Sequence, residues 1–89
     1  MALLKRVTLD ILKPHQPNAL EFGQRIANDS PGCRVRVTVE EVDEKTDTLK
    51  VVVEGEDIDF ESIQQAISDM GASLHSIDEV EVESNTSAD

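Results

Sequence analysis

The chain has 89 residues, the size of a single domain with a thin hydrophobic core. Nineteen Asp and Glu residues outnumber eight Lys and Arg residues, giving a formal net charge of −11, and such a surface would repel a nucleic-acid backbone. Phe22 and Phe60 are the only aromatic residues, which also disfavours stacking on nucleic-acid bases. No apolar run reaches the roughly 18 residues of a membrane span and no signal peptide is recognisable, so we expect a cytoplasmic protein without a membrane partner.

The first predicted element is a strand over residues 4–15. Val7, Leu9 and Ile11 alternate with polar residues, as expected for a strand with one face toward the core. Pro14 ends the strand because proline has no backbone N–H to donate to a ladder. We place this strand in the middle of the sheet.

A helix is predicted next, with apolar residues at three- and four-residue spacing from Ala19 to Ala27. Pro17 suits its first turn. Gly23 weakens a helix by up to about 1 kcal/mol relative to Ala, so we expect it to allow close approach of the helix to the sheet. The segment 28–32, Asn-Asp-Ser-Pro-Gly, ends this element.

The next two predicted strands, over residues 33–42 and 49–54, are joined by a polar connection of hairpin length and should pair antiparallel. A second helix follows, with an apolar stripe from Phe60 to Met70 and either Asp57 or Asp59 as its cap. Gly71 is typical of the position just past a helix end.

The fourth predicted strand covers residues 73–83. Ile77 is out of phase with the other apolar residues of this segment, so it either faces away from the helices or marks a β-bulge. We expect a single domain over residues 1–83 and a disordered tail over 84–89. The element order predicts an α+β, ferredoxin-like βαββαβ fold, in which a four-stranded antiparallel sheet carries two helices on one face.

Four segments carry a resemblance to a known family: residues 9–15 (LDILKPH), 39–43 (VEEVD), 53–55 (VEG) and 75–80 (HSIDEV). Together they resemble the DUF211 family of uncharacterised archaeal proteins over roughly residues 3–82. The resemblance implies a ferredoxin-like fold and a homo-oligomeric, ring-like assembly, and it supplies no activity. The turn at residues 30–34 departs from the family pattern.

A candidate metal site comes from the predicted topology. If the first and fourth strands are antiparallel neighbours, His15 and His75 fall at one end of the sheet, and Asp10 lies near the level of Asp78. Imidazole and carboxylate groups suit a divalent cation such as Ca²⁺. The alternative is that these four are ordinary polar residues, with His15 capping a turn and Asp10 pairing with Arg6 or Lys50.

A second acidic group consists of Glu54, Glu56, Asp57, Asp59 and Glu61. Helix capping and a solvated face explain this group better than cation binding does. Cys33 is the only cysteine, which excludes an intramolecular disulfide and a cysteine-based zinc site. We predict that it is a buried, inert thiol. Because no phosphate-binding loop or hydrolase motif is present, we expect no enzymatic activity. The sequence indicates no cofactor apart from the candidate divalent cation.

Charge is unevenly distributed along the chain. Residues 1–36 carry six basic and three acidic residues, whereas residues 37–89 carry two basic and sixteen acidic residues. Docking the acidic fourth strand of one copy near the Arg-bearing second strand of the next would oppose unlike charges, and repetition would give a ring. The alternative function is a small-ligand sensor that resembles amino-acid-binding ferredoxin-like modules. The acidity also predicts a halophilic source, where salt screens self-repulsion.

Overall fold

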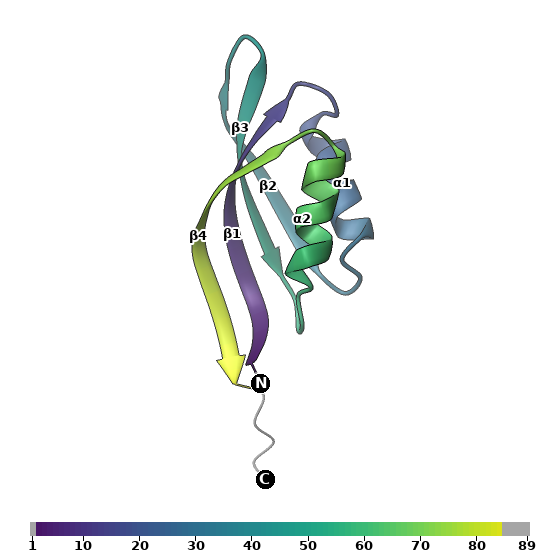
Figure 1. The fold of residues 1–89 in the computed structure, drawn as a ribbon, viewed down its shortest axis with the longest axis vertical. Helices are drawn as coiled ribbons and strands as arrows, with labels where there is room; N and C mark the ends of the chain where they lie inside the picture. The colour runs from purple at the N-terminus through teal and green to yellow at the C-terminus, as the bar shows by residue number, and fades with distance from the viewer. Residues whose placement is uncertain (1, 85–89) are drawn as a thin grey trace.

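The computed structural model describes residues 2–84 and has the predicted α+β, ferredoxin-like architecture. The elements are β1 (Ala2–Pro14), α1 (Ala19–Asn28), β2 (Arg34–Val42), β3 (Thr46–Glu54), α2 (Phe60–Asp69) and β4 (Ser73–Ser84). The strands form one antiparallel sheet in the order β2-β3-β1-β4, and both helices lie on the same side of it (Figure 1). β1 is therefore central, while β2 and β4 are the edges, as predicted.

The core lies between the helices and the two central strands. Val7, Leu9 and Ile11 of β1 are buried, which confirms the predicted inward face of this strand. The remaining buried apolar side chains come from β3, both helices and the segment before α2: Leu49, Val51, Val53, Phe22, Ile26, Ile63, Ala66, Ile67 and Ile58. We call this covered face of the sheet the helix side and the opposite one the open face.

Both helices begin at a side-chain cap. The Asn18 side chain accepts from the Glu21 N–H at 2.8 Å, and the Glu21 carboxylate accepts from the Asn18 N–H at 3.1 Å, a reciprocal capping box. Pro17 therefore precedes the helix instead of occupying its first turn as predicted. Asp59 caps α2 by accepting from the Ser62 N–H at 3.3 Å, which identifies the cap among the two predicted candidates.

Gly23 lets α1 approach the edge strand β2 closely. A Cβ atom added at Gly23 would lie 3.1 Å from a methyl carbon of Val37, which is closer than ordinary van der Waals contact. The glycine thus offsets its low helix propensity by allowing this contact, as the sequence indicated.

The alternation of β4 is interrupted by β-bulges. In the pairing with β1, the register shifts between Thr8 and Leu9 and again between Asp10 and Ile11. Leu9 pairs with Ile77, so the out-of-phase Ile77 lies between two bulges and shares a face with the buried β1 residue opposite it. β4 extends to Ser84, one residue past the predicted domain boundary, and the rest of the predicted tail, 85–89, lies outside the described residues.

Candidate functional site

The bulges set the positions of two predicted metal ligands. Asp10 pairs with Ser76 and Leu9 with Ile77, so His75 and Asp78 are the residues skipped by the ladder of β4. Bulges commonly re-aim side chains near functional sites. Asp10 was predicted near the level of Ile77 and Asp78, and it lies opposite Ser76, one and two residues away along β4.

Asp10 and His75 come together in a small depression of about 210 Å³. Leu12 and Thr48 line it as well. Asp10 lies opposite Lys50 in the ladder, but neither Lys50 nor Arg6, its two predicted partners, forms an ion pair with it within residues 2–84. Lys50 instead approaches Glu40 at 3.7 Å. The carboxylate of Asp10 and the imidazole of His75 are thus the two predicted ligands that share one site.

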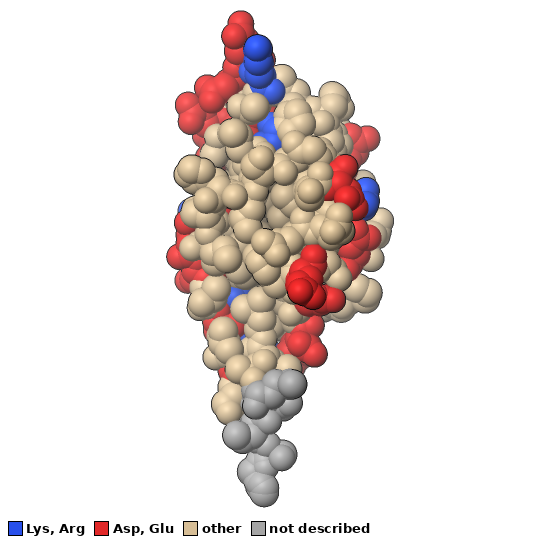
Figure 2. Space-filling view, viewed as in Figure 1, with Lys and Arg blue, Asp and Glu red and all other residues tan. Residues whose placement is uncertain are grey.

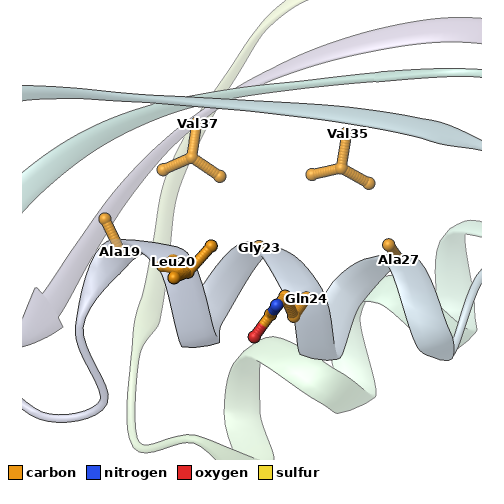
Figure 3. A pocket seen from close by; sticks show the side chains of 7 residues that line it. All are labelled: Ala19, Leu20, Gly23, Gln24, Ala27, Val35 and Val37. Atoms are coloured by element: carbon orange, nitrogen blue, oxygen red, sulfur yellow. The ribbon is translucent and has the colours of Figure 1, made fainter.

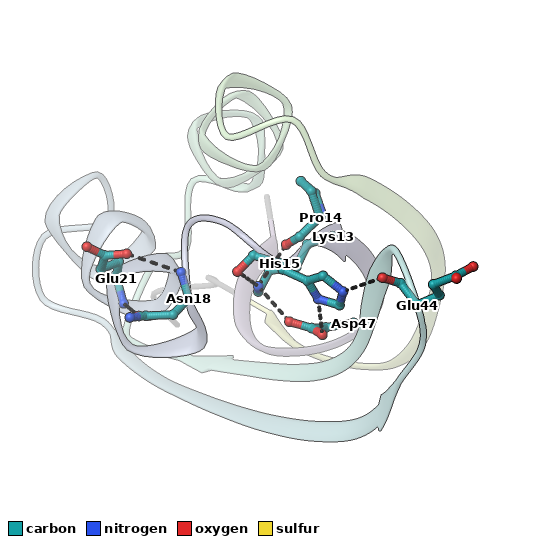
Figure 4. Close-up of polar contacts among 7 residues, drawn as sticks. All are labelled: Lys13, Pro14, His15, Asn18, Glu21, Glu44 and Asp47. Carbon is teal, nitrogen blue, oxygen red and sulfur yellow. Dashed lines mark hydrogen bonds and ion pairs between the residues drawn. The ribbon is translucent and has the colours of Figure 1, made fainter.

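His15 points elsewhere, toward the hairpin between β2 and β3 (Figure 4). Its Nδ1 lies 2.9 Å from Asp47 Oδ1, and its Nε2 lies 2.9 Å from the carbonyl oxygen of Glu44. Asp78 accepts from the Ser76 hydroxyl at 2.7 Å. Among residues 2–84, no group of three or more His, Cys, Asp and Glu side chains is arranged to hold a metal ion. Cation binding stays a prediction, with Asp10 and His75 as its best-placed pair.

Lys13 completes a polar cluster at this end of the sheet, which we call the hairpin clasp: Lys13, His15, Asp47 and the carbonyl of Glu44. The Lys13 ammonium donates to Asp47 at 2.9 Å and to the carbonyls of Pro14 at 2.9 Å and His15 at 3.3 Å. Its side chain is fully buried. The clasp ties the end of β1 to the start of β3, and Figure 4 shows these contacts converging.

Both ring nitrogens of His15 face oxygen acceptors, an arrangement satisfied only when both carry a proton. The Glu44 carbonyl, followed by the Asp47 carboxylate, raises the pKa of His15 above its usual value. The hydrogen bond from Lys13, with a smaller contribution from His15, lowers the pKa of Asp47 despite partial burial. The geometry therefore favours an imidazolium paired with a carboxylate.

Three residues of the second acidic group make contacts within the chain, and one of them, Asp59, is the predicted helix cap. Glu54 lies 3.5 Å from the Arg6 guanidinium and Glu56 lies 3.0 Å from the Lys5 ammonium. Asp59 caps α2, and the Ser62 hydroxyl and N–H lower the pKa of its carboxyl group.

Cys33 is partly buried against Gly55, where an added Cβ would meet its sulfur at 2.8 Å. Burial, and then the negative charge of Asp57, raise the pKa of the thiol. A raised pKa disfavours the thiolate, so this cysteine is poorly suited to act as a nucleophile.

The two edge strands carry charged side chains that form no ion pair, or only a long one, among residues 2–84. Arg34 and Arg36 of β2 form no ion pair with any residue in the described range 2–84, although Arg34 shares a charged cleft of about 490 Å³ with Glu81 and Glu83. Glu81 of β4 likewise has no ion-pair partner among these residues, and Glu83 has only Lys5, at 4.0 Å.

A groove separates α1 from β2, and Figure 3 shows the side chains that line it. The groove measures about 380 Å³ and is mostly apolar. Its lining residues are Ala19, Leu20, Gly23, Gln24 and Ala27 of α1 with Val35 and Val37 of β2. The sequence showed Leu20 within the helical stripe but did not reveal that its side chain stays 69% exposed.

On the opposite edge, β4 presents a row of exposed apolar side chains, which we call the β4 ridge: Ile77, Val80 and Val82. Val80 pairs with the buried Val7, so this row belongs to the helix side of the sheet. In Figure 2 the face over β4 and α2 has few charged side chains at its centre, and acidic side chains gather along its margins. Adjacent exposed apolar side chains are common at interaction surfaces of other proteins.

Neither helix of the described part of the chain has the length and apolar character needed to cross a membrane. The model of the DUF211 family, described as uncharacterised ArCR, matches residues 5–86. An uncharacterised protein of Methanocaldococcus jannaschii is 42% identical over 77 residues, which cover 86% of this chain and 79% of that protein. Both findings confirm the resemblance seen in the sequence.

Proposed function

We propose that this chain, which belongs to the DUF211 family of uncharacterised proteins, is a binding protein that assembles from identical copies through its two sheet edges. The observation that carries the proposal is that unlike charges lie on the opposite edges and form no ion pair within the described part of the chain: Arg34 and Arg36 on β2, and Glu81 on β4. A sheet edge with free backbone groups also invites pairing with another strand.

The strand directions support this pairing. Neighbouring strands all run antiparallel in the order β2-β3-β1-β4, so the two edge strands run in opposite directions. When two copies in the same orientation lie side by side, β4 of one is therefore antiparallel to β2 of the next. The end of β4 then lies beside the start of β2, and Glu81 and Glu83 approach the two arginines.

The other half of the same junction avoids a clash of like charges. Glu40 and Glu41 lie near the end of β2, and they would stand beside the start of β4, where residues 73–77 contain no acidic side chain. The contact uses different surfaces on the two copies, so repetition produces a closed ring when the rotation per copy divides a full turn.

The acidic composition fits assembly in a salt-rich cytoplasm. Copies with a formal charge of −11 repel each other in dilute buffer. At molar salt the Debye length is about 3 Å, which screens this long-range repulsion more strongly than it screens charge pairs in direct contact at the junction. The role we propose is binding instead of catalysis, consistent with the raised pKa of the Cys33 thiol.

The experiment is a mass measurement by light scattering in molar KCl. The parent chain should elute at a multiple of 9.8 kDa. The double variant Arg34→Glu/Arg36→Glu should be monomeric, because glutamates would face glutamates, and Glu81→Arg/Glu83→Arg should be monomeric for the mirrored reason.

An equimolar mixture of the two double variants should assemble again, because every junction then opposes unlike charges. Lys45→Glu, which makes the hairpin loop more acidic without touching either edge, is the matched control and should keep the parent mass. A parent chain that remains monomeric in both dilute buffer and molar KCl would refute the proposal.

A further inference from the structure

The β4 ridge and the groove between α1 and β2 lie on opposite edges but on the same side of the sheet. Val35 and Val37 line the groove and pair with the buried β3 residues Val53 and Val51, so they point to the helix side. Val80 and Val82 also point to the helix side, through their pairs with Val7 and Leu4. A sheet continued from one copy to the next would place the ridge directly beside the groove.

One register satisfies the apolar and the charged side chains together. Antiparallel pairing of Val80 with Val37 sets Val82 opposite Val35, because each step along one strand is matched by a step back along the other. The same register sets Glu81 opposite Arg36 and Glu83 opposite Arg34 on the open face. Both sets of side chains would be matched without a bulge over these four pairs.

We infer that β4 of one copy pairs with β2 of the next in this register, with the β4 ridge seated in the groove against α1. The inference rests on the proposed function and adds its partner surface: a second copy of this chain, held by Val80 and Val82. Leu20, which is 69% exposed in the single chain, would close over the seated ridge.

Apolar contacts between the β4 ridge and the groove would hold acidic copies together in strong salt. Screening at molar ionic strength weakens the attraction between charges at the rim of the junction. The burial of apolar surface does not depend on charge, so this screening does not weaken it. The valine pairs and Leu20 would then supply cohesion, while the arginine and glutamate pairs set the register.

Disulfide trapping tests the register. In a Cys33→Ser background, Val37→Cys with Val80→Cys should form covalent multimers on oxidation in molar KCl, since directly opposed strand residues have the Cα separation that a disulfide needs. Arg36→Cys with Glu81→Cys, at two exposed positions of the same register, should also form covalent multimers. This second pair tests the register even if substitution of the partly buried Val37 disturbs folding.

The matched control is Val35→Cys with Val80→Cys, which is two residues out of register and should cross-link poorly. Equal or stronger cross-linking in this control overturns the register. An oligomeric parent that traps through none of these pairs also overturns it, and leaves edge assembly itself standing. A monomeric parent refutes the proposed function, and with it this inference.

Substitution at the groove tests these apolar contacts. Leu20→Glu should reduce the parent assembly to monomers in molar KCl, because a carboxylate would occupy the apolar seat. Leu12→Glu makes the same change at a residue 42% exposed on the open face of the central strand β1, away from both edges, and should retain the assembly. Retained assembly in Leu20→Glu, or equal loss in Leu12→Glu, would overturn the role of the groove.

Discussion

Two lysine–carboxylate contacts of almost equal length lie at opposite ends of β1. Lys13 and Asp47 are 2.9 Å apart, and Lys5 and Glu56 are 3.0 Å apart. The side chains of the first pair are 0% and 13% exposed, whereas those of the second are 17% and 98% exposed. The energetic weight of an ion pair therefore has to be judged from its surroundings, because water screens the second pair and is largely excluded from the first.

The two ends of the sheet also differ in how far their charged side chains are buried. At the hairpin end, the clasp joins β1 to the β2–β3 hairpin, so this end is closed by contacts within the chain (Figures 1 and 4). At the other end, the start of β1 pairs with the end of β4, and the acidic side chains there are exposed. The exposed acidic side chains at this second end belong to the edge strand β4, which we propose for contact with a second copy.

The largest effect should come from removing the carboxylate of the buried pair. Asp47→Ala should lower Tm by roughly 10 °C or more, since it leaves a buried ammonium without its counter-ion. Thermal unfolding followed by circular dichroism measures the change. Asp43→Ala on the same hairpin should change Tm little, and an equal loss there would mean that the hairpin is merely sensitive to substitution.

An intermediate, pH-dependent effect is expected at His15. The pKa of His15 is raised in the folded protein, so its stabilising contribution is fully present below the ordinary value of about 6.5 and is lost as pH rises through the raised pKa. The pKa of Asp47 is lowered, so its contribution is present above about pH 4 and is lost on further acidification.

The Tm difference between the parent and His15→Ala should therefore be greatest near pH 5–6, at about 2–4 °C, and should shrink toward pH 8. His75→Ala is the matched control, since its ring makes no hydrogen bond or ion pair within residues 2–84. A difference that is constant from pH 5 to pH 8 would contradict a role for the charged imidazole.

The smallest effect should come from the exposed pair. Glu56→Gln should change Tm by about 1 °C or less, and raising the KCl concentration should remove even that change. A loss comparable to that of Asp47→Ala would show that burial is not what distinguishes the two contacts.

Much of the fold could be predicted from residues that are close together in the sequence. The alternation of Val7, Leu9 and Ile11 predicted β1 and its inward face, and the short polar connection after Val42 predicted the hairpin. The cap of α2 was narrowed to two residues, of which Asp59 is the one used. Each of these features depends on side-chain period or turn chemistry over a few consecutive positions.

The candidate sites were predicted less well because they depend on contacts between distant segments. His15 and His75 were expected together, yet His15 binds the hairpin 29–32 residues away in sequence, at Glu44 and Asp47. Lys13 continues the inward parity of Val7, Leu9 and Ile11, a signal that could have indicated its burial, but its partner Asp47 lies on another strand. The groove could have been sought from Gly23 and Leu20, a small and a large apolar residue on one helix face, but its other wall belongs to β2.

By itself, the sequence determined the order of the elements, the inward face of each central strand and the uneven distribution of charge, since these follow from residue type and local spacing. Only the tertiary structure decided the bulges of β4, the partners of His15 and Lys13, and the positions of the ridge and groove on one side of the sheet. These features depend on strand register and helix placement, which are set by packing among residues far apart in the chain.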